Sequence, residues 1–269
     1  MRMLFLLLAM PLLLAAAPPK RPQRIVSLNL CADQYLLALA DPGQIAALTR
    51  FARDPQMSAE AEKAAHVPIS RGSAEEVLAL RPDLIIASPF RRRETMAQLR
   101  GREIATVDLP SAESYADIVA QVRQIAAAVG YPERGEALVA QMDRRLAAVP
   151  RDGGAGATAA YYQRRGYLTG TGTLVDEMLR RVGLRNLAER LGKPSLARIG
   201  LEEMARARPD YLIVESASEH VIDQGTEMLH HPILADIPRI RIPQAWTVCG
   251  GPAYADAVAS LSAQLKPGR

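Results

Sequence analysis

Hydrophobic and polar positions follow the same order at two places in the chain. Within residues 73–87, Val77 and Leu78 fall on helical spacing, and Pro82 excludes helical geometry from the residue before it. Residues 84–86 then form a short, continuous apolar run. This pattern predicts a short helix, a stop and a strand that is buried on both faces.

The second copy of this pattern, residues 200–214, begins 127 residues after the first, and six of its fifteen positions are identical. The identities are two adjacent glutamates, the Arg-Pro-Asp stop and one isoleucine of the strand. Repeats of a solenoid would follow at a shorter period. The spacing therefore predicts two similar lobes.

The remaining apolar runs alternate with helical patterns, which indicates parallel sheets covered by helices. We expect an α/β protein with two Rossmann-like lobes and mostly parallel sheets. Strands are predicted at residues 24–28, 45–48, 84–86, 104–107, 157–162 and 240–242, and in the second repeat. Helices are predicted up to residue 39, at 174–182, near 227–234 and at 254–265.

A long helical segment breaks this alternation near the middle of the chain. Residues 115–129 carry an apolar stripe at helical spacing, Gly130, Tyr131 and Pro132 interrupt it, and a second helical stripe follows. This is too much helix for a simple crossover. We predict an N-terminal lobe at 18–112, a connecting helical segment at 113–150 and a C-terminal lobe at 151–269.

The N-terminus has the pattern of an export signal. Arg2 precedes an apolar run, and Ala15, Ala16 and Ala17 provide a small-residue cleavage site. The run is too short to span a bilayer, which takes about 20 residues. We predict a signal peptide at residues 1–17 and a mature protein in an oxidising compartment.

Composition excludes several classes of function. The net charge is +4, but the sequence has no dense basic run with interleaved aromatic residues, so we expect no nucleic-acid partner. The four histidines lack zinc-site spacing, and we expect no metal site and no resident cofactor. The Gly170-Thr171-Gly172-Thr173 loop could hold an anion through its backbone N–H groups, but it lacks the lysine of a nucleotide-binding loop.

Taken together, these segments resemble the periplasmic binding proteins of ABC importers for cobalamin, ferric siderophores and haem. The opening strand 24–28, both repeats, the central helical segment and residues 167–186 carry the resemblance. It implies two α/β lobes joined by a single long α-helix, with a ligand held between them. It also implies a monomer that delivers a metal chelate to an ABC permease dimer.

Glu75 and Glu202 occupy equivalent positions of the two repeats. A homodimeric permease would present two equivalent basic pockets, which matches two equivalent carboxylates. The resemblance places permease docking at these positions. We interpret Glu76 and Glu203 as residues favoured at helix starts by the helix dipole.

Ligands of such folds bind at the loops that follow the carboxyl ends of the strands. These loops carry several arginines, whereas Ser88 and Leu196 stand where a cobalamin binder of this family would offer aromatic residues. An anionic chelate is therefore favoured, either a ferric siderophore or haem. The candidate ligand-binding residues are Asn29, Cys31, Asp33, Phe51, Arg71, Phe90, Arg91, Tyr161, Tyr162, Arg164, Arg198, Trp246 and Cys249.

Cys31 and Cys249 lie in cleft loops, one in each predicted lobe. An even cysteine count in an exported protein favours a disulfide, but free thiols that contact the ligand are also compatible with the sequence. A second hypothesis is an exported α/β enzyme that uses one of these cysteines. Thiol-dependent turnover of an ester or a peptide would distinguish it from a binding protein.

Overall fold

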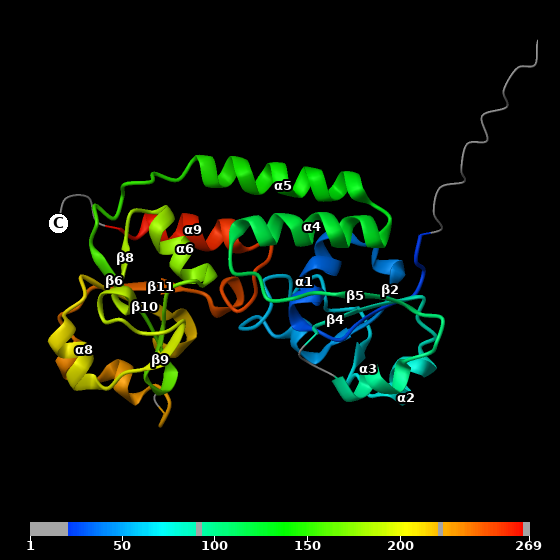
Figure 1. The fold of residues 1–269 in the computed structure, drawn as a ribbon, viewed down its shortest axis with the longest axis horizontal. Coiled ribbons are helices and arrows are strands. Elements are labelled where there is room, and N and C mark those ends of the chain that lie inside the picture. The colour runs from blue at the N-terminus through cyan, green and yellow to red at the C-terminus, as the bar shows by residue number, and fades with distance from the viewer. Residues whose placement is uncertain (1–20, 90–92, 220–222, 266–269) are drawn as a thin grey trace, which may run out of the picture.

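The computed structural model describes residues 21–89, 93–219 and 223–265, and these fold into two α/β lobes. The N lobe and the C lobe each contain one sheet, and a helical layer of α4, α5 and α9 runs along one side of both (Figure 1). Among the described residues, no helix is long and apolar enough to cross a membrane.

The N-lobe sheet is entirely parallel, in the order β3-β2-β1-β4-β5. Its strands are β1 (Ile25–Ser27), β2 (Ile45–Thr49), β3 (Ile69–Ser70), β4 (Leu84–Ala87) and β5 (Ala105–Asp108), and its helices are α1 (Leu30–Leu39), α2 (Ala74–Ala79) and α3 (Arg93–Leu99). Asn29 caps α1 by accepting a hydrogen bond from the Cys31 N–H at 2.7 Å.

The C-lobe sheet has the order β11-β10-β6-β7-β9, with β8 beside β6. The pairs of β10 with β11, β10 with β6 and β6 with β8 are parallel, while β7 is antiparallel to β6 and β9. The strands are β6 (Thr158–Gln163), β7 (Tyr167–Thr169), β8 (Arg185–Asn186), β9 (Leu196–Arg198), β10 (Tyr211–Glu215) and β11 (Arg239–Ile242). The helices are α6 (Leu174–Arg181), α7 (Leu187–Arg190), α8 (Leu201–Ala207) and α9 (Tyr254–Ala263).

The two repeats end their helices in the same way. Arg81 and Arg208, which precede the prolines, both adopt a left-handed backbone with φ of 45°. The aspartates after the prolines each hold the start of their lobe's first strand. Asp83 accepts the Arg24 N–H at 2.9 Å, and Asp210 accepts the Thr158 N–H at 2.7 Å. The repeated sequence therefore fixes the helix end to the sheet in both lobes.

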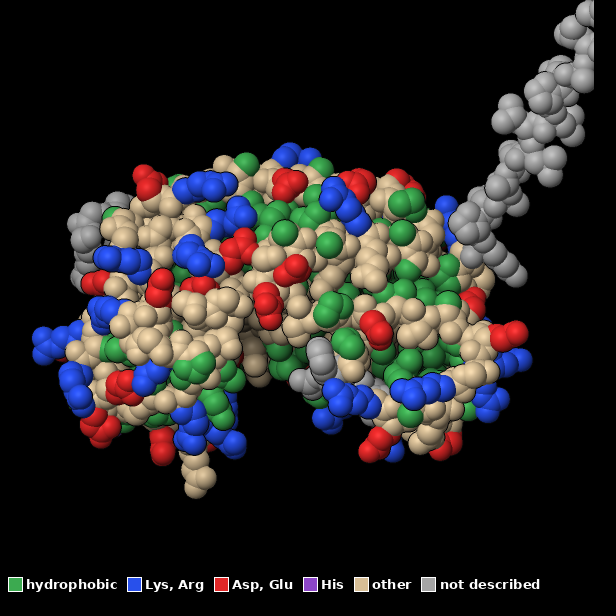
Figure 2. All heavy atoms as spheres, viewed as in Figure 1, with side chains coloured by type: hydrophobic (Ala, Val, Ile, Leu, Met, Phe, Trp, Pro, Cys, Tyr) green, Lys and Arg blue, Asp and Glu red, His purple; other side chains and the backbone are tan. Residues whose placement is uncertain are grey.

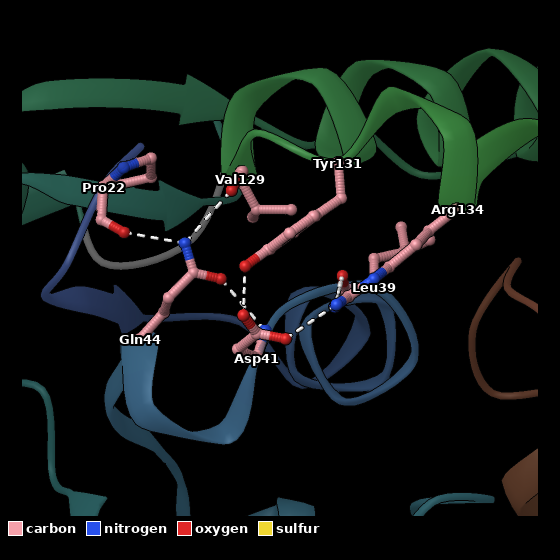
Figure 3. Close-up of polar contacts among 7 residues, drawn as sticks. All are labelled: Pro22, Leu39, Asp41, Gln44, Val129, Tyr131 and Arg134. Atoms are coloured by element: carbon pink, nitrogen blue, oxygen red, sulfur yellow. Dashed lines mark hydrogen bonds and ion pairs between the residues drawn. The ribbon is translucent and has the colours of Figure 1, made fainter. Parts of the chain in front are cut away.

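The lobes are connected by a helical hairpin, α4 (Tyr115–Val129) and α5 (Pro132–Ala147), and α5 carries the chain from the N lobe to the C lobe (Figure 1). At the start of α5, the Asp41 carboxylate accepts hydrogen bonds from the Tyr131 hydroxyl and from Arg134, the latter at 2.7 Å (Figure 3). Near its end, Arg145 pairs with Asp256 of α9 at 2.6 Å. The helix is thus attached to both lobes.

One large cluster of buried apolar residues continues from the N lobe through α4 and α5 into the C lobe. It includes Leu36, Ile125, Met142 and Val258, all at most 2% exposed. Such continuity opposes independent movement of the lobes. The helix expected near residues 227–234 is instead two 3₁₀ turns, because Pro232 begins a new turn there.

Candidate functional site

A cavity of about 830 Å³ lies at the carboxyl ends of the N-lobe strands and extends to a C-lobe loop. Because all five strands are parallel, the residues after them meet at one edge of the sheet. Figure 2 shows the molecule hollowed between the lobes on the side away from α5. The lining residues are Leu28, Asn29, Leu30, Cys31, Thr49, Arg50, Phe51, Met57, Ser70, Arg71, Ser88, Leu109, Pro110, Ser111, Val248 and Cys249.

In the described part of this lining, the charged residues are two arginines. Arg50 follows β2 and Arg71 follows β3, and both are exposed. The Arg50 guanidinium lies 4.5 Å from the centre of the Phe51 ring. No carboxylate belongs to the lining among the described residues. The cavity wall is therefore cationic, with apolar surface beside the charges.

A glutamate outside the cavity shapes the turn that carries Arg71. The Glu76 carboxylate accepts the Ser70 hydroxyl at 2.8 Å and the Arg71 N–H at 2.7 Å. These hydrogen bonds, that of Ser70 first, lower the pKa of Glu76. Glu76 thus has a structural role at the edge of the site, in addition to its place at the start of α2.

Asp33 lies beneath the cavity and holds the end of β2. Its side chain is fully buried, and its two carboxylate oxygens accept the Thr49 N–H at 3.1 Å and the Thr49 hydroxyl at 2.5 Å. Burial raises the pKa of Asp33 from 3.8 to about 7, and the hydrogen bonds from Ser27 and Thr49 oppose that rise. Asp33 therefore positions Thr49, the residue before Arg50, and is not itself among the residues that line the cavity.

We expect the free energy of unfolding to fall as the pH rises from about 4 to about 7, the range between the pKa values of Asp33 in the unfolded and the folded chain. The folded chain keeps the Asp33 proton up to about pH 7, whereas an unfolded chain loses it near 3.8. Asp33→Asn, which stays neutral, should lose this slope. Free energies of unfolding in urea, measured at about pH 5 and about pH 8, would test this. Between these two pH values the wild type should lose more stability than Asp33→Asn.

Cys31 and Cys249 form a disulfide with a Cα–Cα distance of 5.4 Å. The bond joins the first turn of α1 in the N lobe to the loop before α9 in the C lobe, and both residues line the cavity. The favoured sequence prediction of a disulfide is confirmed. Both cysteines of the chain are consumed in it, so the alternative of free thiols does not hold for this structure.

Five of the predicted ligand-binding residues line the cavity: Asn29, Cys31, Phe51, Arg71 and Cys249. Six others do not: Asp33, Tyr161, Tyr162, Arg164, Arg198 and Trp246. Phe90 and Arg91 lie outside the described residues.

The residues outside the cavity have other roles. Tyr161 and Tyr162 are 2% and 0% exposed because β6 is covered on both faces, and their hydroxyls bond to Thr247 and to the Ile199 carbonyl. Arg164 pairs with Asp223 at 2.8 Å. Arg198 lines a separate depression of about 340 Å³ beside Glu202, and Trp246 packs against the large core.

Sequence reasoning missed Met57 and the segment 109–111 as lining residues, and it did not single out Arg50 and Val248 within the loops that it assigned to the cleft. Residues 109–111 directly follow β5, so the rule that ligands bind after the strands would have identified them. Met57 lies in an irregular segment with no such signal. In the glycine loop, the Gly172 N–H donates to Asp176 at 3.2 Å, so a carboxylate of the chain itself already occupies that donor.

Glu75 and Glu202 are both exposed, in the first turns of α2 and α8. The two helices lie on the same side of the molecule, opposite α5 (Figure 1). The described residues contain no group of three or more His, Cys, Asp or Glu side chains that could hold a metal ion.

The fold and the inter-lobe cavity define a two-lobe binding protein, and residues 25–241 match the family model for periplasmic binding proteins. The chain belongs to this family. It is 26% identical over 266 residues to the vitamin B12-binding protein of Pectobacterium carotovorum subsp. carotovorum (strain PC1), covering 94% of this chain and 92% of that one. Members of this family bind cobalamin, haem or siderophores and lie in the periplasm.

Two further relatives differ in how much of their length is matched. The cobalamin-binding protein of Halobacterium salinarum (strain ATCC 29341 / DSM 671 / R1) is 25% identical over 215 residues, which cover 78% of this chain but only 58% of that protein. The structure of the periplasmic heme-binding protein RhuT from Roseiflexus sp. RS-1, in apo form, superposes with a TM-score of 0.72 at 26% identity. That match covers 90% of this chain and 97% of RhuT.

Proposed function

We propose that this protein captures an anionic metal chelate, a ferric siderophore or haem, in the cavity between its lobes and delivers it to an ABC permease dimer. The observation that carries the proposal is the pair of arginines, Arg50 and Arg71, in a lining whose described residues include no carboxylate. Guanidinium groups bind carboxylates and catecholates through charge-assisted hydrogen bonds. The apolar rim of Phe51 and Val248 would cover the less polar faces of the chelate.

The size of the cavity supports this ligand class. Its volume of about 830 Å³ lies in the upper part of the usual range for small-molecule sites, roughly 300–1,000 Å³. Cobalamin is the alternative that the similarity to vitamin B12-binding proteins favours. The two arginines favour an anionic chelate over it, since cobalamin presents mainly neutral amides to its binding partner.

The proposal also covers export of the protein and its contact with the permease. Residues 1–17 would direct export and be removed, and the mature chain would act as a monomer in the periplasm. Glu75 and Glu202 would contact the permease, one from each lobe. Both are exposed, in the first turns of α2 and α8, and these two helices lie on the side of the molecule opposite α5.

The alternative of an exported enzyme with a catalytic cysteine receives no support from the site. A thiolate is needed as nucleophile, and both cysteines are bonded to each other. The described part of the cavity wall also contains no histidine that could serve as a base.

Isothermal titration with haemin, a ferric tris-catecholate and cyanocobalamin tests the proposed function. We expect tight binding of one anionic chelate and much weaker binding of cyanocobalamin. Tight binding of cyanocobalamin alone would overturn the choice of an anionic ligand. Binding of none of the three, together with no chelate in mass spectra of protein purified from its native periplasm, would overturn the chelate class.

A further inference from the structure

One short segment of the C lobe forms part of a cavity that the N lobe otherwise builds. This segment, Thr247–Gly250, which we call the strap, follows Trp246 and precedes α9. Val248 and Cys249 of the strap are the two lining residues from beyond the connecting helices, and the other lining residues precede α4. The ligand would therefore be enclosed by the N lobe and the strap.

The strap is attached to the N lobe at three points. The first is the disulfide between Cys249 and Cys31 of α1. The second is a hydrogen bond of 2.8 Å from the Tyr35 hydroxyl to the Gly250 carbonyl, and Tyr35 is 0% exposed. The third is a close approach: a Cβ placed on Gly250 would lie 2.4 Å from the Ala112 Cβ, so only glycine fits there.

The other end of the strap belongs to the C lobe. The Thr247 side-chain oxygen lies 2.9 Å from the hydroxyl of Tyr161, which is buried in β6. Trp246, the only tryptophan of the chain, is partly buried against the large core. The strap thus joins the two lobes at the cavity, as a second connection besides α5.

We propose that these attachments make the strap the positioning element of the ligand site. Held by Tyr35, Gly250 and the disulfide, it presents Val248 and Cys249 to the ligand in a fixed place before any ligand arrives. Preorganisation of this kind raises affinity because the segment does not have to lose conformational entropy when the ligand binds. Ligand affinity then depends on the strap's attachment to the N lobe and not on closure of the lobes. This inference rests on the proposed function of the cavity.

Two pairs of variants separate this role from general stability. Gly250→Ala should push the strap off Ala112, whereas Gly251→Ala is its matched control because nothing lies within 4 Å of a Cβ at Gly251. Tyr35→Phe removes the hydroxyl that holds Gly250. Tyr162→Phe is its control, since Tyr162 is equally buried and donates to the Ile199 carbonyl away from the cavity.

Two readouts are measured on each variant and on wild type reduced with dithiothreitol. One is the emission maximum of Trp246 without ligand. The other is the affinity for whichever of haemin, ferric tris-catecholate or cyanocobalamin the wild type binds. Gly250→Ala, Tyr35→Phe and reduction should shift Trp246 to the red and weaken binding about tenfold or more. Both controls should match the wild type.

Equal affinity of Gly250→Ala, Tyr35→Phe and wild type would overturn the strap's role and leave the proposed function intact. If no probe binds the wild type, the proposed function fails, and the strap's attachment is judged from the Trp246 emission alone. An unshifted emission maximum both on reduction and in Tyr35→Phe would then overturn the attachment. Tyr35→Phe keeps the test valid if Gly250→Ala does not fold, because it removes one oxygen atom and adds no bulk.

Discussion

Replacing both Glu75 and Glu202 with arginine is expected to abolish uptake of the chelate and to leave its dissociation constant unchanged. Both glutamates are exposed in the first turns of α2 and α8, and neither lines the cavity of about 830 Å³. Arginine at these positions would meet the basic pockets of a permease with like charge. Uptake measured in cells and binding measured on the purified protein separate the two effects.

The two glutamates should contribute comparably, because the repeats place them at equivalent positions of two helices on one side of the molecule (Figure 1). A symmetric permease dimer would engage both at once, so each single variant should lose most of the uptake. Glu133→Arg, at the exposed start of α5 on the opposite side, is the matched control and should transport normally. Full uptake by the double variant, or a weakened dissociation constant, would contradict the docking assignment.

The sequence predicted the architecture well because its repeat encodes local contacts. Ser73 caps α2 through the Glu76 N–H, the prolines end both helices, and Asp83 and Asp210 hold the strands that begin each lobe. All of these interactions follow from residue type and spacing. The left-handed geometry of Arg81 and Arg208 was not foreseen, since the residue before a proline usually adopts an extended conformation.

The candidate site was predictable where a residue follows a strand of the N lobe or belongs to the cysteine pair. Asn29, Phe51 and Arg71 satisfy that condition and line the cavity. Tyr161 and Tyr162 were assigned to a cleft loop at the end of a predicted strand, but β6 continues to Gln163, and a strand buried on both faces directs them into the core. In the strap, the cysteine count indicated the contact of Cys249 with Cys31, whereas Val248 depends on a contact between positions far apart in the chain that no local pattern reports.

Reversing both charges of the cavity, Arg50→Glu with Arg71→Glu, is expected to weaken binding of an anionic chelate at least about 100-fold. A hydrogen bond to a charged group contributes roughly 1.5–3 kcal/mol, and two such groups would be replaced by repulsive ones. Arg50 and Arg71 follow neighbouring parallel strands, so they can reach one anionic group together. Titration with the anionic chelate that the wild type binds measures the loss.

Arg102→Glu makes the same type of charge reversal at one position of the N lobe away from the cavity and should bind normally. It is exposed and precedes β5, so it lies at the opposite edge of the sheet from the cavity. Arg50→Lys with Arg71→Lys should recover only part of the affinity, because lysine keeps the charge but lacks the planar fork of guanidinium. If the double glutamate variant bound the chelate as tightly as Arg102→Glu, the two arginines would not hold the ligand and the anionic class would have to be abandoned.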